Sequence, residues 1–207
     1  MKKNFKFLVL FLALLMFVSS FSFLGGTSFA ESKKAKKAKY VFLFIGDGMG
    51  AAQVNAAQIY TGDKKKVEIK PLEFYKFPTV GLVNTEDSTS FCPDSASTAT
   101  AISSGTKTYS GVIGKSSDLQ NNVTTVAEKM KEQGKKIGII STVTLNHATP
   151  AAFYANVTSR KQYYEIGKQM ATSGFDYFAG GSLAHRTGDD KNKKEKDLYD
   201  ILKANGY

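Results

Sequence analysis

The sequence predicts an α/β fold with three layers, in which helices cover both faces of a mostly parallel sheet. Three observations support this prediction. Apolar runs of strand length alternate along the chain with segments that carry helix-capping residues. The uninterrupted apolar run at residues 40–45 is typical of a strand buried on both faces. The roughly 177 residues that follow residue 30 suit one domain.

The elements follow in order along the chain. Strands are predicted at residues 40–45, 79–84, 136–142 and 177–179. Helices are predicted at residues 51–60, 95–104, 125–133, 162–173 and 197–204. Gly105, Gly134 and Gly206 lie just past three of these helices, where glycine commonly ends a helix.

Residues 1–30 have the pattern of a signal peptide. Lysines precede an apolar run at residues 7–18, and small residues before Ala30 suit a cleavage site. The alternative is a retained membrane helix, because the uncharged stretch 7–30 is long enough to span a bilayer. That stretch turns into Ser, Gly and Thr in its second half. We therefore expect cleavage near Ala30, no stable membrane anchor, and a secreted or extracytoplasmic protein.

The net charge of +10 comes partly from lysine runs. Residues 31–39 form a lysine-rich segment, and a second lysine cluster lies within residues 191–196. Both are expected to be solvated, with weak attraction to anionic surfaces as the alternative. Nucleic-acid binding is not expected, because aromatic residues do not interleave with the lysines. The single cysteine, Cys92, cannot form an internal disulfide and is interpreted as a packing residue.

Two residues indicate chemistry at the ends of predicted elements. Asp47 lies between glycines after the strand predicted at 40–45, and ligands of such sheets bind beyond the carboxyl ends of strands. Ser95 begins a helix of small residues, where free backbone N–H groups and the helix dipole favour phosphate. Each has a structural alternative: Asp47 as a turn residue, and Ser95, with Asp94, as a helix N-cap.

A third segment favours the functional interpretation. Residues 142–150 leave a predicted strand end and lead to Arg160, whose guanidinium suits bidentate phosphate binding. Together the three segments indicate phosphate-ester chemistry with a serine nucleophile. A serine hydrolase of the α/β-hydrolase type is excluded, because the sequence lacks Gly-x-Ser-x-Gly and a usable histidine partner.

The stretches FLFIGDGMG, PDSASTATAISSGTKTYSGVIG and STVTLNHATPAAFYANVTSR resemble the alkaline phosphatase family. The resemblance extends over residues 39–207. It implies that family's α/β fold, two Zn²⁺ and one Mg²⁺, and hydrolysis of phosphate monoesters through a phosphoserine. It also implies inorganic phosphate as a ligand, and it allows a homodimer of the complete enzyme.

The resemblance implies a role for each matching residue. Ser95 resembles the serine that is phosphorylated and binds zinc, and Arg160 the arginine that grips two phosphate oxygens. Asp47 resembles the carboxylate between one zinc and the magnesium, and Thr149 the hydroxyl ligand of magnesium. The two remaining roles belong to neighbours of these ligands: Asp94 would orient the arginine, and His147 would lie near the magnesium.

The sequence departs from the family in its metal ligands. Family members supply three zinc histidines, further aspartates and a magnesium glutamate from later in the chain, whereas this sequence has only His147 and His185. The Asp-x-x-x-His pattern of the zinc sites is absent, and His185 is interpreted as a surface residue. We therefore expect residues 40–207 to be the N-terminal part of an alkaline phosphatase domain. We also expect an incomplete sheet with an exposed apolar edge, and little activity by itself.

Two other functions stay open on the sequence. One is a secreted fragment that binds phosphate without turning over a substrate. The other is a different hydrolase of the same superfamily, such as a sulfatase or phosphodiesterase. Sulfatases modify a residue in a Cys/Ser-x-Pro-x-Arg setting, which the sequence around Cys92 does not match.

Overall fold

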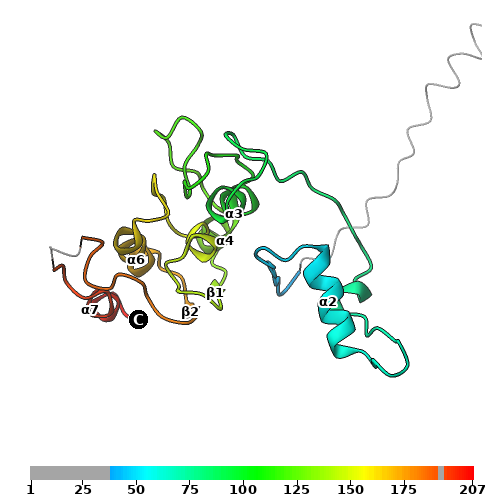
Figure 1. Cartoon of the computed structure of the whole chain (residues 1–207). Helices are drawn as coiled ribbons and strands as arrows, with labels where there is room; N and C mark the ends of the chain where they lie inside the picture. The colour runs from blue at the N-terminus through cyan, green and yellow to red at the C-terminus, as the bar shows by residue number, and fades with distance from the viewer. Residues whose placement is uncertain (1–37, 191–193) are drawn as a thin grey trace, which may run out of the picture. The chain divides into compact units, whose positions relative to one another are not determined.

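The computed structural model describes residues 38–190 and 194–207 (Figure 1). The predicted signal peptide and most of the lysine-rich segment lie outside the described residues. The chain divides into two units between Ile45 and Gly46. The described part of the first unit, residues 38–45, is extended and exposed. All helices and strands of the described residues belong to the second unit.

The predicted helices are present, with ends that differ by one residue at most. They are α2 (Ala51–Thr61), α3 (Ser95–Ser104), α4 (Val126–Glu132), α6 (Tyr163–Thr172) and α7 (Leu198–Ala204). Two short elements were not predicted: the 3₁₀ turn η1 (Glu73–Lys76) and the four-residue α5 (Ala148–Ala151).

Local capping chemistry explains where the helices begin and end. The carboxylate of Asp94 accepts the N–H of Ser97 at the start of α3, and Thr125 forms a capping box with Glu128 at the start of α4. Gly105 ends α3 in the left-handed conformation at φ +75°, a backbone angle that residues with a Cβ rarely adopt.

The sheet consists of two parallel strands, β1 (Gly138–Ile140) and β2 (Tyr177–Ala179), within the part of the chain that the structure describes. Ile139 pairs with Phe178 at the centre of the register. Their parallel pairing around helical connections confirms the α/β class. The prediction of a buried strand at 136–142 was too long, and β1 buries only one side: Ile139 is partly buried whereas Ile140 is exposed.

Two predicted strands are wrong. Residues 40–45 and 79–84 lie in no strand, and large apolar side chains in both runs, such as Phe44 and Leu82, are exposed. The physical reason is that a strand is stabilised by hydrogen bonds to a neighbour, which an apolar run cannot supply by itself. No ladder hydrogen bond joins either run to β1 or β2.

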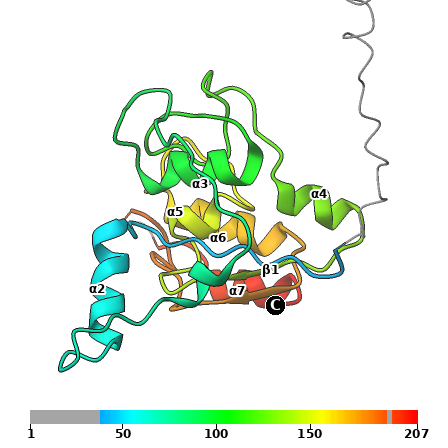
Figure 2. The same cartoon turned by 90° about the vertical axis from the view of Figure 1, so that its right-hand side faces the viewer.

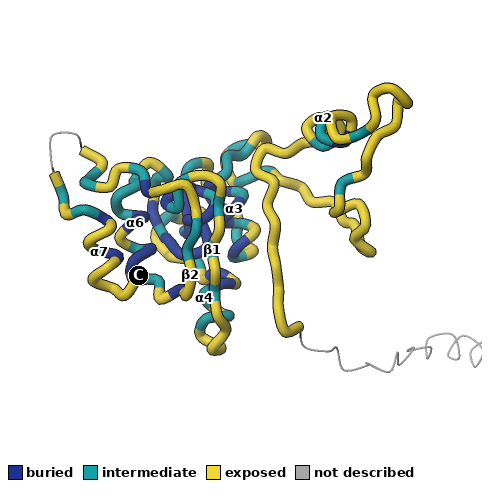
Figure 3. The backbone as a smooth tube through the Cα atoms, turned by 90° about the horizontal axis from the view of Figure 1, so that it is seen from below, coloured by how far each residue is buried: buried dark blue, intermediate teal, exposed yellow. Residues whose placement is uncertain are grey.

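The core of the second unit lies between the helices and the sheet (Figures 2 and 3). Helix α3 packs on α5 and α4, and α6 packs on α7. The hydroxyl of buried Ser103 donates to the carbonyl of Ala152 at 2.6 Å and ties α3 to the end of α5. Gly167 gives Leu198 room to pack against α6, since a Cβ at position 167 would lie 2.4 Å from the leucine side chain. These contacts fix α3 and α5, to which the predicted site residues Ser95 and Thr149 belong.

Helix α2 contributes little to this core. Figure 3 shows the segment that carries it as mainly exposed, and Gln58 is its one buried residue. Among the residues that the structure describes, no helix is both long and apolar enough to cross a membrane.

Candidate functional site

Ser95 occupies the first position of α3, directly after the capping residue Asp94. The first N–H groups of a helix have no partner within it, and the dipole adds positive potential at the same end. Asp94 uses one of them by accepting the N–H of Ser97 at 3.1 Å. The serine hydroxyl therefore lies where the backbone favours an anion.

Asp47 connects two residues that are far apart in the sequence. Its Oδ1 accepts the hydroxyl of Ser95 at 3.2 Å, and its Oδ2 accepts the hydroxyl of Thr149, on α5, at 2.7 Å. Asp47 lies in a turn with Gly48, whose φ of +66° requires a left-handed backbone. The structure thus brings together three of the oxygen-bearing side chains that the sequence singled out.

Arg160 is held at three points beside this group. Its Nη1 donates to Asp94 Oδ2 at 2.9 Å, and its Nη2 lies 3.1 Å from Nε2 of His147. Its backbone N–H donates to the carbonyl of Gly111 at 2.7 Å. The side chains of Arg160 and Asp94 are each 27% exposed, so the guanidinium is oriented without being sealed from solvent.

Burial, hydrogen bonds and nearby charges shift the pKa values of Asp94 and His147. Burial raises the pKa of Asp94, but hydrogen bonds from the backbone of Gly111 and Ser97 and from Arg160 outweigh burial and lower it. Burial and the charge of Arg160 lower the pKa of His147, against the opposing effect of Asp47. A guanidinium only donates, so Nε2 of His147 accepts and the ring proton lies on Nδ1, which is buried without a hydrogen-bond partner.

The oxygen donors of this group fit magnesium better than zinc. A carboxylate and two hydroxyls are hard ligands of the kind Mg²⁺ prefers, whereas zinc sites in proteins draw on histidine or cysteine. Across residues 38–190 and 194–207, no three His, Cys, Asp or Glu side chains converge as a metal site. Nε2 of His147 faces Arg160, and His185 pairs with Asp189 at 3.1 Å. The residues present therefore do not fit the two zinc ions that the resemblance implies.

Sequence reasoning missed Gly111 as part of this arrangement. Its carbonyl holds the backbone of Arg160, and its backbone hydrogen bonds to Asp94. Its φ of +82° belongs to the left-handed region, and glycine after Tyr109 and Ser110 was the available signal for a turn. The link between His147 and Arg160 had no signal in the sequence.

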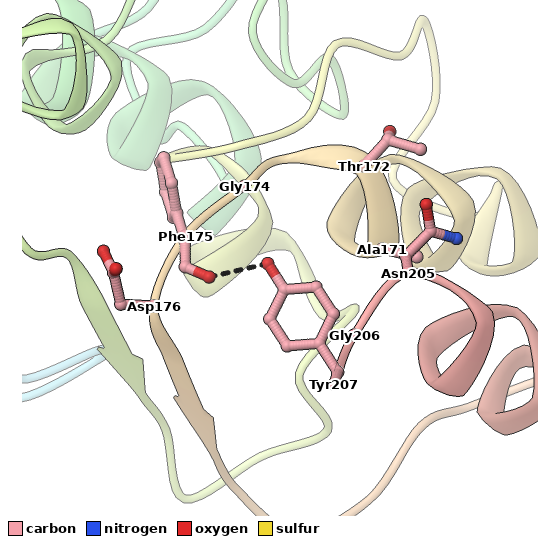
Figure 4. A pocket seen from close by; sticks show the side chains of 8 residues that line it. All are labelled: Ala171, Thr172, Gly174, Phe175, Asp176, Asn205, Gly206 and Tyr207. Carbon is pink, nitrogen blue, oxygen red and sulfur yellow. Dashed lines mark hydrogen bonds between the residues drawn. The ribbon is translucent and has the colours of Figure 1, made fainter.

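A pocket of about 440 Å³ lies elsewhere, at the C-terminal ends of α6 and α7 (Figure 4). Phe175, Asp176 and Tyr207 contribute to its lining, and the hydroxyl of Tyr207 donates to the carbonyl of Phe175 at 2.7 Å. The carboxylate of Asp176 forms ion pairs with Lys131 and Lys136. No residue of the Asp47 group lines this pocket, so we do not assign the site to it.

The family model for alkaline phosphatase matches residues 38–195. This chain belongs to the alkaline phosphatase family. Alkaline phosphatase 4 of Drosophila melanogaster is 41% identical over 139 residues, which cover 63% of this chain and 23% of that protein. Alkaline phosphatase 3 of Bacillus subtilis (strain 168) is 32% identical over 196 residues, covering 88% of this chain and 41% of that protein. The chain thus spans about a quarter to two-fifths of the length of these relatives.

Solved structures agree with the assignment. The cold-active alkaline phosphatase of Shewanella sp. superposes with a TM-score of 0.67 at 31% identity, covering 79% of this chain and 39% of that chain. The alkaline phosphatase of the Antarctic bacterium TAB5 also gives a TM-score of 0.67, at 34% identity, covering 77% of this chain and 43% of that chain. The fold class and the family expected from the sequence are therefore confirmed.

Proposed function

We propose that this chain supplies the nucleophile and the phosphate clamp of a metal-dependent phosphate monoesterase. The observation that carries the proposal is the Asp47 carboxylate, which contacts the hydroxyls of Ser95 and Thr149 while Arg160 is anchored on Asp94 beside them. Membership of the alkaline phosphatase family supports phosphate monoesters as the substrate class. A sulfatase or phosphodiesterase has no comparable support.

The proposed role of each residue is the one that the family resemblance implies, and the observed contacts support it. The Oγ of Ser95 attacks phosphorus, the bond from phosphorus to the ester oxygen breaks, and the proton given up by the serine hydroxyl reaches the leaving oxygen through solvent, so that the alcohol leaves. Asp47 accepts the hydrogen bond from the Ser95 hydroxyl and so directs its proton away from the attacking lone pairs. Arg160 pairs with two non-bridging oxygens of the phosphoryl group, and the N-terminus of α3 adds positive potential. Water then hydrolyses the phosphoserine and releases inorganic phosphate.

We propose that Asp47 and Thr149 hold the magnesium ion of the complete enzyme. Their hard oxygen atoms suit this ion, and a variant of the TAB5 enzyme was solved with Mg bound in its M3 site. Held there, the ion would supply Lewis-acid stabilisation of charge that develops on oxygen. Zinc at Asp47 and Ser95 requires further ligands, which the described residues do not offer. A homodimer of the complete enzyme stays a prediction.

By itself the 207-residue chain is therefore proposed to bind phosphate but to turn over little or no substrate. The second candidate, a secreted phosphate-binding protein without catalysis, is favoured by the lack of converging metal ligands in the described residues. Neither candidate predicts tightly held zinc in the purified chain, because its described residues do not offer the ligands. The two candidates differ in the complete enzyme, where only the first predicts turnover.

Titration of the purified chain with inorganic phosphate in the presence of Mg²⁺ tests the proposal. We expect saturable binding at one site, displaced by p-nitrophenyl phosphate. No saturable binding by a folded chain would contradict the proposed phosphate site.

We also propose that the chain is exported and cleaved near Ala30, on the strength of its N-terminal sequence pattern. The mass of the mature protein tests this. A product that keeps residues 1–30 would contradict cleavage.

A further inference from the structure

Asp87 lies outside the group described above and receives five hydrogen bonds. Its Oδ1 accepts the N–H and the hydroxyl of Thr89 at 2.7 and 2.9 Å, and the N–H of Ser90 at 2.7 Å. Its Oδ2 accepts the hydroxyls of Ser97 at 2.7 Å and Ser110 at 2.5 Å. Burial raises the pKa of Asp87, but the donors, Ser110 and Ser97 foremost, outweigh burial and hold the pKa well below its usual range.

The two serines belong to different segments of the chain. Ser97 is buried in the first turn of α3, two residues after Ser95. Ser110 lies in the loop that follows α3, directly before Gly111. A single oxygen of Asp87 therefore joins the nucleophile helix to this loop.

Both segments hold the ion pair of Asp94 and Arg160. The N–H of Ser97 donates to Asp94 Oδ1, and the backbone of Gly111 also hydrogen bonds to Asp94. The carbonyl of Gly111 accepts the N–H of Arg160 at 2.7 Å. Each segment thus sets the position of one or both partners of the ion pair.

The hydroxyl of Ser97 connects Asp87 directly to Asp94. It carries one hydrogen and lies near two carboxylates, 2.7 Å from Asp87 Oδ2 and 3.1 Å from Asp94 Oδ1. The shorter distance assigns the hydrogen to Asp87. Without that acceptor the hydroxyl turns to Asp94, where it competes with Arg160 for the same negative charge.

We propose that Asp87 is a positioning residue that fixes the Asp94–Arg160 ion pair and so aims the guanidinium at phosphate without touching phosphate itself. The statement that Arg160 binds phosphate rests on the proposed function. The effect of Asp87 on the Asp94–Arg160 ion pair does not. Asp87→Asn keeps the size of the side chain but removes its charge and one of its two acceptor oxygens.

The sequence offers a clean probe, because it contains only two arginines, Arg160 and Arg186. The full chain is labelled with ¹⁵N-arginine, and the guanidinium signals are recorded by NMR. Arg160→Lys assigns the signals by loss of one set. In Asp87→Asn we expect the Arg160 signals to shift or broaden, while those of Arg186, which pairs with Asp197, stay unchanged.

Asp118→Asn is the matched control. Asp118 also accepts a serine hydroxyl, from Ser116 at 2.5 Å, and the backbone N–H groups of Gln120 and Asn121. These bonds close a local turn with no link to Arg160. We expect this variant to leave the Arg160 signals unchanged.

Ser110→Ala removes the hydrogen bond from the loop to Asp87 and keeps the one from Ser97. It tests the positioning role of Asp87 if Asp87→Asn does not fold. We expect it to move the Arg160 signals in the same direction by a smaller amount. Unchanged Arg160 signals in a folded Asp87→Asn or Ser110→Ala chain would overturn the proposal.

Phosphate titration then separates this inference from the proposed function. We expect Asp87→Asn to raise the Kd for inorganic phosphate roughly three- to thirty-fold, and to have no further effect in an Arg160→Ala background. Equal effects in both backgrounds would overturn action through Arg160. A chain that binds no phosphate but shows the shift of the Arg160 signals would refute the proposed function and leave the positioning role standing.

Discussion

Arg160→Ala should weaken phosphate binding far more than it weakens the fold. The substitution removes the two charge-assisted hydrogen bonds that Arg160 is proposed to donate to phosphate, each worth about 1.5 kcal/mol at the low end of the usual range. Their loss, about 3 kcal/mol, corresponds to a roughly 100-fold rise in the Kd for inorganic phosphate.

The cost to stability is smaller for two reasons. The ion pair with Asp94 is partly exposed, at 27% for each side chain, which places its contribution near 1 kcal/mol. Asp94 also keeps its hydrogen bonds from Gly111 and Ser97, so the substitution does not leave a carboxylate without donors. A melting temperature lowered by about 2–4 °C is expected for a chain of this length.

Isothermal titration with phosphate and thermal unfolding of the same samples measure the two effects. Arg186→Ala is the matched control, because Arg186 also pairs with an aspartate, Asp197, and lies over the ring of Tyr199. We expect it to lower stability by a similar amount with no change in the phosphate Kd. An unchanged Kd in a folded Arg160→Ala chain, or an equal rise in Arg186→Ala, would refute the assignment of Arg160.

Three further predictions concern the fold that holds the site. Gly167→Ala should lower the free energy of unfolding by about 1–3 kcal/mol in a urea titration, because the new Cβ would meet Leu198, whereas Lys168→Ala beside it should have little effect. Asn146→Asp should lower it by about 3 kcal/mol or more, because the buried amide donates to the carbonyls of Tyr163 and Ala184, which a carboxylate would repel. Asp176→Asn should flatten the acid dependence of stability: hydrogen bonds from Lys131 and Ile137 hold the pKa of Asp176 below its unfolded value. The contribution of Asp176 is therefore present above about pH 4 and is lost as the pH falls further. Unfolding curves of Asp176→Asn and the unsubstituted chain that stay parallel from pH 6 to pH 3 would contradict this last prediction.

The helices could be predicted because their signals are local. Asp94 caps α3 and Thr125 caps α4 through hydrogen bonds to residues three positions away, and Gly105 ends α3 one residue after its last turn. The strands could not be predicted as well, because a strand is defined by a partner that can lie anywhere in the chain. The apolar run at 40–45 has the composition of a buried strand, but it pairs with no strand among the residues that the structure describes. The four-residue α5 is too short to show a periodic pattern.

In the site, too, some features could be predicted from the sequence and others could not. Residue types and family motifs predicted Asp47, Ser95 and Thr149 as a group, and the structure brings them within hydrogen-bond distance across 102 positions of sequence. The way in which Arg160 is held could not be predicted. Its bond to His147 and the position of Gly111 depend on how two loops fold back on α3, and no pattern in either loop specifies that geometry.

The most direct test of the account is the turnover of p-nitrophenyl phosphate by the purified 207-residue chain at alkaline pH, with Zn²⁺ and Mg²⁺ added. The chain carries the proposed nucleophile and phosphate clamp, but its described residues lack the ligands for two zinc ions. We therefore expect turnover indistinguishable from that of the buffer. Turnover of about 1 per second or more, as in ordinary enzymes, would contradict it.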